Sequence, residues 1–85
     1  MKTTEQLIEE MCESMKNLLI QKNRDYGDSA TNPSNVFSAG SPIESLCARI
    51  DDKIMRIKNK GINDQTEDTV DDLIGYLLLL KMSMS

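Results

Sequence analysis

Four cations are spaced along one segment of the chain so that a helix would place them on a single face. The steps between them are four, three and four residues, in the order Arg49, Lys53, Arg56 and Lys60. Side chains three or four positions apart are neighbours on a helix surface. Guanidinium groups donate paired hydrogen bonds to phosphate oxygens, and a lysine ammonium adds a compact positive charge. This basic row therefore has the chemistry to bind a phosphorylated ligand.

Carboxylates follow in the next helical pattern. Asp68 and Asp72 are four residues apart, with Asp71 beside them and Tyr76 one turn further on. Because Mg²⁺ takes oxygen ligands from a few carboxylates and keeps several waters, Asp68, Asp71 and Asp72 are candidate metal ligands. If the two helices pack antiparallel, cations and carboxylates would pair across the interface or line a common pocket. For any one charge alone, a surface ion pair worth about 0 to 1 kcal/mol is the simpler interpretation.

Polar and aromatic residues fill a long segment without helical periodicity, residues 23–40. Loops of this length are usually functional or disordered, and the aromatic residues Tyr26 and Phe37 favour an ordered loop that packs against the helices. The two rings either anchor the loop or stack on a base, an interaction worth about 1 to 3 kcal/mol. On the loop and the helices together, the candidate ligand-binding residues are Lys22, Arg24, Asp25, Tyr26, Asn35, Phe37, Arg49, Lys53, Arg56 and Tyr76.

Three amphipathic helices must position these residues. Apolar side chains recur at steps of three and four in three segments, the spacing of a helix with one buried face. These segments are residues 3–22, 42–60 and 65–83. The second has the clearest start, because Ser41, Pro42 and Glu44 supply an N-cap, a first-turn proline and a capping-box glutamate. We predict an all-α fold, with residues 1–85 forming one domain.

Composition limits the class of protein further. The chain has 85 residues, no Trp and one Phe, so its core must be thin, and we expect a homo-oligomer of long helices to complete it. The net charge is −4 and there is no His, which argues against a nucleic-acid partner and against histidine zinc sites. No apolar stretch reaches the length of a membrane span.

Two cysteines, Cys12 and Cys47, fall within the helical apolar patterns. That placement is unlike the dense spacing of a secreted disulfide scaffold, so we predict buried free thiols. The first residues are charged rather than apolar, which is unlike a secretory signal. A cytoplasmic location is therefore expected.

Four stretches of the sequence, in this order and spacing, resemble the nucleotide modification associated domain 1 family of bacteriophages and prophages. They are KNRDYG at 22–27, NVF at 35–37, RIDDKIMRI at 49–57 and EDTVDDLIGY at 67–76. That family is similar to the all-α MazG-like nucleoside triphosphate pyrophosphatases, which bind Mg²⁺ through a Glu-x-x-Glu pair on one helix and a Glu-x-x-Asp pair on a later one. By this resemblance Asp68 and Asp71 would stand for the later pair, whereas the second helical segment has no Glu-x-x-Glu. The first helical segment has Glu10 and Glu13 at this spacing, but together with Glu9 they have the pattern of an exposed face.

The missing carboxylate pair favours a non-catalytic function. The interpretation we favour is a phage-type protein in the host cytoplasm that binds or sequesters a nucleotide, or a nucleotide-derived signal such as one of host defence. The alternative is an Mg²⁺-dependent, MazG-like pyrophosphohydrolase or an accessory enzyme of nucleotide modification. A third possibility is a helical oligomer with a purely structural role.

Overall fold

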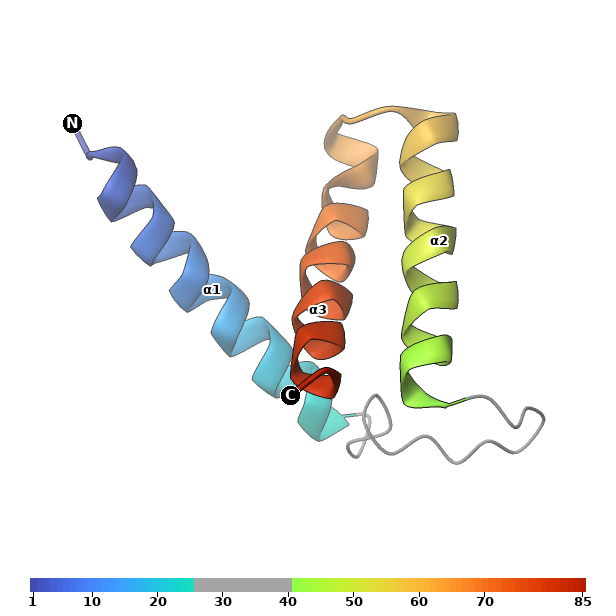
Figure 1. Ribbon diagram of the computed structural model, residues 1–85. Coiled ribbons are helices and arrows are strands. Elements are labelled where there is room, and N and C mark those ends of the chain that lie inside the picture. Colours follow the sequence, from blue (N-terminus) through green and yellow to red (C-terminus); the bar gives the residue numbers. More distant parts are fainter. Residues whose placement is uncertain (26–40) are drawn as a thin grey trace.

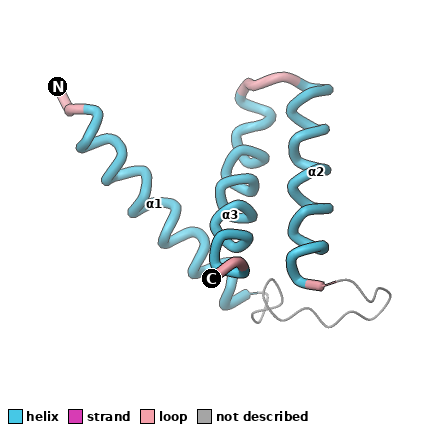
Figure 2. The backbone as a smooth tube through the Cα atoms, in the orientation of Figure 1, coloured by secondary structure: helices cyan, strands magenta, loops and turns pink. Residues whose placement is uncertain are grey.

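The computed structural model describes residues 1–25 and 41–85, and in these ranges the chain is built from helices. The helices are α1 at Thr4–Asp25, α2 at Pro42–Lys60 and α3 at Glu67–Ser83, with a turn of 3-10 helix, η1, at Asp64–Thr66. The described ranges contain no strand (Figure 2). The predicted all-α fold with three helices is confirmed.

α2 and α3 form an antiparallel hairpin, and α1 diverges from it (Figure 1). The two hairpin helices lie side by side along their length, whereas α1 makes its helix contacts with α3. The amino-terminal half of α1 extends away from the hairpin, so that the amino terminus is distant from α2 and α3. Every residue from 1 to 14 is exposed.

Both ends of α2 lie where the sequence predicts them. The Ser41 hydroxyl accepts a hydrogen bond from the Glu44 amide at 3.1 Å, and the Glu44 carboxylate accepts one from the Ser41 amide at 3.3 Å. This reciprocal pair is the predicted capping box. At the other end Gly61 has φ of 80°, and its amide donates to the Ile57 carbonyl at 2.7 Å. Glycine adopts a positive φ without the steric cost other residues meet.

α1 ends at Asp25, three residues later than predicted. The side-chain amide of Gln21 donates to the Asp25 carboxylate at 3.0 Å, an i to i+4 contact typical of a helix surface. Lys22 and Arg24 place positive charge at the negative end of the helix dipole. The predicted loop over 23–40 is therefore wrong for residues 23–25, and its remainder lies outside the described residues.

The turn between α2 and α3 is held by Thr66, which has no exposed surface. Its hydroxyl donates to the Gly61 carbonyl at 2.8 Å and accepts from the Asn63 amide at 3.0 Å. The Asn63 side chain in turn accepts from the Gln65 amide at 2.9 Å. These contacts pair backbone groups of an exposed turn through the buried Thr66 side chain and the Asn63 side chain.

The apolar core is as thin as the composition indicates. Among the described residues, the buried apolar side chains are Met15, Leu46 and Ile50. Many large apolar side chains remain exposed on all three helices, among them Leu7, Ile8, Met11, Ile20, Ile54, Met55, Ile74, Leu77, Leu78 and Met82. Cys12 and Cys47 are free thiols as predicted, but both are exposed, so the prediction that they are buried is wrong.

No helix in the described ranges combines the length and apolar character that a membrane span requires.

Candidate functional site

One carboxylate, Asp72 on α3, joins all three helices. The ammonium group of Lys22, near the end of α1, lies 2.8 Å from Asp72 Oδ1. The ammonium group of Lys53, in the middle of α2, lies 3.3 Å from Asp72 Oδ2. The sequence predicted charges on α2 and α3 that pair across their interface, and the Lys53–Asp72 pair is one such contact.

The ionisation of Asp72 reflects this position. Desolvation would raise its pKa, but hydrogen bonds and positive charge from Lys22 and Lys53 outweigh it, so that the pKa lies below the ordinary value of 3.8. Asp72 is therefore a carboxylate at neutral pH. Its side chain is 25% exposed, so water screens both ion pairs only partly.

Arg49 and Tyr76 make the next contact between α2 and α3. The guanidinium carbon of Arg49 lies 5.9 Å from the centroid of the Tyr76 ring, within cation–π range. Arg49 is four residues before Lys53, and Tyr76 is four residues after Asp72, so the two cross-helix contacts lie one turn apart. We call Lys22, Arg49, Lys53, Asp72 and Tyr76 the basic cluster. It carries three cations and one carboxylate.

Arg49 retains hydrogen-bonding capacity toward a ligand. Within residues 1–25 and 41–85 neither Arg49 nor Arg56 forms an ion pair, and both side chains are exposed. A guanidinium over an aromatic ring keeps its in-plane N–H donors available. Arg56 follows one turn after Lys53 on the basic row. This edge of α2 thus presents two unpaired guanidinium groups beside the Lys53–Asp72 pair.

Among the described residues, the other predicted residues of α1 and α3 form no ion pair with the basic cluster. Arg24 lines a groove between α1 and α3, and Asp25 accepts the hydrogen bond from Gln21. Asp68 is exposed at the start of α3 and Asp71 is partly exposed. Three predicted ligand contacts, Tyr26, Asn35 and Phe37, fall outside the described residues.

The aspartates of α3 do not gather as a metal site. In the part of the chain that the structure describes, no group of three or more carboxylates, thiols or imidazoles lies close enough to hold a metal ion. Asp72 instead pairs with the two lysines. The candidate ligand set Asp68, Asp71 and Asp72 is therefore not brought together.

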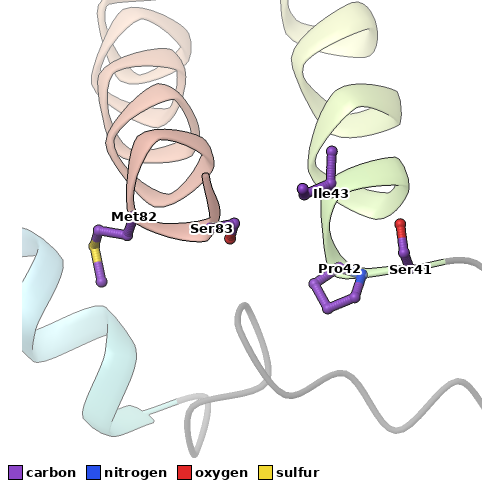
Figure 3. Close-up of a pocket in the computed structure, with 5 residues that line it drawn as sticks. All are labelled: Ser41, Pro42, Ile43, Met82 and Ser83. Carbon is purple, nitrogen blue, oxygen red and sulfur yellow. The ribbon is translucent and has the colours of Figure 1, made fainter. Parts of the chain in front are cut away.

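Hollows lined by described residues lie between the helices. A small pocket of about 390 Å³ lies between the first turn of α2 and the last turn of α3, lined by Ser41, Pro42, Ile43, Met82 and Ser83 (Figure 3). A larger groove of about 650 Å³ lies between α1 and α3 and has a mostly apolar lining. Neither hollow could be predicted from the sequence, because both depend on how helix segments distant in sequence pack together.

Gly75 leaves room for Leu19 where α1 packs against α3, and it is not among the residues predicted from the sequence. A Cβ placed on Gly75 would lie 2.6 Å from a terminal methyl of Leu19. Gly75 is buried within an otherwise leucine-rich helix. A lone glycine inside a helical pattern costs about 1 kcal/mol relative to alanine and often has a packing reason. The position of Gly75 within an apolar helical pattern was therefore the sequence signal that could have predicted this close packing.

In comparisons with known proteins, no family model, no curated protein and no solved structure matches the chain.

Proposed function

We propose that this chain is a small, non-catalytic nucleotide-binding protein that holds the phosphates of its ligand at the basic cluster. The observation that carries the proposal is the pairing of Lys22 and Lys53, from two helices, with a single ionised carboxylate, Asp72. One turn away, Arg49 lies over the Tyr76 ring. The chain as a whole has a net charge of −4. A local excess of positive charge in an acidic protein attracts an anion to that place.

The donor set suits phosphate better than a simple carboxylate. Arg49 and Arg56 can each donate two parallel hydrogen bonds to one phosphate group, and Lys53 supplies a point charge between them. Tyr76 holds the Arg49 guanidinium in place through its ring face. Two guanidinium groups and a lysine along one helix edge would bind a chain of phosphates or two separate ones.

The base and the biological use of the ligand form the second part of the proposal. The sequence resemblance to a phage and prophage family of nucleotide modification suggests a nucleotide or a nucleotide-derived signal, which the protein would sequester in the host cell. Tyr26 and Phe37 are the proposed stacking partners of the base. Self-association into a homo-oligomer belongs to the same proposal and is supported by the thin core.

Titration calorimetry with linear and cyclic nucleotides tests the proposal. We expect saturable binding of at least one nucleotide. Arg49→Met should weaken it about tenfold to hundredfold, because a hydrogen bond to a charged group contributes about 1.5 to 3 kcal/mol. Lys58→Met removes the same charge from an exposed position on another face of α2 and should leave the affinity unchanged.

The absence of binding to every nucleotide tested would refute the proposal. Equal losses in Arg49→Met and Lys58→Met would also argue against it, because a general charge effect would then explain the result. Release of pyrophosphate from a nucleoside triphosphate with Mg²⁺, abolished by Asp71→Ala, would replace it with the hydrolase alternative.

A further inference from the structure

Among the residues that the structure describes, the amino-terminal half of α1 has no packing partner in its own chain. All residues from 1 to 14 are exposed, including Leu7 at 52%, Ile8 at 58% and Met11 at 60%. An isolated helix of about a dozen residues is only marginally stable in water. Three large apolar side chains along a projecting helix therefore point to a surface that becomes covered.

The groove between α1 and α3 is apolar, like the exposed side chains of the projecting helix half. Its apolar lining includes Met15 and Leu19 on α1 and Ile74, Leu78 and Met82 on α3. Of these, Ile74, Leu78 and Met82 each keep 40% or more of their surface exposed. The groove begins near the middle of α1, where the projecting half starts. One chain thus carries both an uncovered apolar helix and an apolar groove beside it.

Charge is unevenly distributed along α1, so that two antiparallel copies would attract each other. The first half carries four glutamates, Glu5, Glu9, Glu10 and Glu13, and the second half carries Lys16, Lys22 and Arg24 with one carboxylate, Asp25. Within their own chain Lys16 pairs with Glu13 and Lys22 pairs with Asp72. Lys16 and Arg24 lie at the groove. Two antiparallel α1 helices would place the acidic half of each against the basic half of the other, whereas parallel helices would place like charges together.

We propose that the groove of each chain receives the amino-terminal half of α1 from a second copy of this chain, in an antiparallel, two-fold pair. Each copy then gives one helix half and accepts one, as a self-complementary interface requires. The side chains of Ile8 and Met11 enter the apolar part of the groove, and Glu5 and Glu9 approach Arg24. Among the described residues Arg24 has no ion-pair partner within its own chain.

The mass of the protein in solution tests the proposal without any ligand, so its failure would leave the proposed nucleotide binding untouched. Sedimentation equilibrium should show a dimer, or an assembly of dimers, that Ile8→Glu converts to smaller species. The matched control is Asn17→Glu, which adds the same charge on the opposite, exposed face of α1. It should leave the mass unchanged. A monomeric wild-type chain, or equal effects of the two variants, would overturn the proposal.

Charge reversal tests the antiparallel direction and does not place a charge in an apolar contact. Arg24→Glu should raise the dimer dissociation constant about tenfold, since like charges then oppose each other across the interface. Adding Glu5→Arg and Glu9→Arg to the same chain should restore the wild-type dissociation constant. Circular dichroism should show that the helix content is unchanged. Failure of the triple variant to recover the wild-type mass distribution would exclude the antiparallel contact.

Discussion

Asp72 contributes to stability through its charge, so its contribution depends on pH. Its folded pKa is lowered below 3.8, which means that the contribution is complete above about pH 4 and is lost as the pH falls through the folded pKa. Asp72→Asn should therefore reduce the free energy of unfolding by about 1 kcal/mol at neutral pH. Chemical denaturation at a series of pH values should show this difference disappearing in acid.

Asp71→Asn is the control for that measurement. Asp71 is the preceding residue, loses the same charge and forms no ion pair within the described residues. Its variant should stay close to the wild type at neutral pH. A difference between Asp72→Asn and wild type that persists unchanged in acid would show that Asp72 acts through its shape rather than its charge.

Thr66 tests the turn between α2 and α3 at the level of one hydroxyl. Thr66→Val keeps the shape of the side chain but removes the partner of the Gly61 carbonyl and the Asn63 amide. Because an intramolecular hydrogen bond contributes about 0.5 to 1.5 kcal/mol, the loss of two should lower the unfolding free energy by about 1 to 3 kcal/mol. Thr69→Val, also at a buried position but outside the hydrogen bonds that Thr66 makes in the turn, should cost less. Equal losses would contradict the role assigned to Thr66.

The sequence predicts some residue roles better than others. The capping box of Ser41 and Glu44 was predictable because all its atoms lie within four residues. The pair of Lys22 with Asp72 was not, because these residues are 50 positions apart and their contact depends on how α1 crosses α3. Exposure of Cys12 and Cys47 was missed for a related reason: an apolar stripe is buried only if something packs against it.

At the scale of elements, the contact of α1 with α3 depends on the absence of a side chain at Gly75. Gly75→Val should push Leu19 away and weaken the packing of α1, while the α2–α3 hairpin stays folded. Overpacking of this kind costs about 1 to 3 kcal/mol. Limited proteolysis should then cut within α1 sooner than in the wild type.

A double variant separates this steric effect from a change in helix propensity. Adding Leu19→Ala to Gly75→Val frees the space that the valine needs, so part of the lost stability should return, giving a coupling of about 0.5 to 3 kcal/mol. Strictly additive effects would show that Leu19 and Gly75 do not compete for the same space.

Helix boundaries were predicted to within a few residues because periodicity, caps and glycine are local signals. The bounds of α2 agree with the prediction, whereas α1 continues to Asp25. There the polar composition of residues 23–25 indicated a loop, but the Gln21–Asp25 contact extends the helix. In the candidate site, the basic row of α2 was predicted from the sequence. Within the described residues Lys53 forms an ion pair whereas Arg49 and Arg56 do not, and this difference could not be predicted because it depends on where α3 lies.

At the scale of the whole molecule, the reactivity of Cys12 should report assembly. Cys12 is exposed in the single chain and lines the α1–α3 groove. In a Cys47→Ser background, a second copy in that groove should slow the reaction of Cys12 with a thiol reagent. Ile8→Glu should restore fast reaction, and dilution should do the same. A rate that is fast and independent of concentration in the wild type would contradict burial of Cys12 between copies.

The short connection between α2 and α3 has a consequence for the order of folding. Contacts within this hairpin join segments close in sequence, whereas α1 reaches α3 through contacts such as Lys22–Asp72, 50 residues apart. Short loops close at a lower entropic cost and form faster. We expect the hairpin to be structured in the transition state and α1 to dock afterwards. Leu46→Ala should then slow refolding, while Leu19→Ala should mainly speed unfolding.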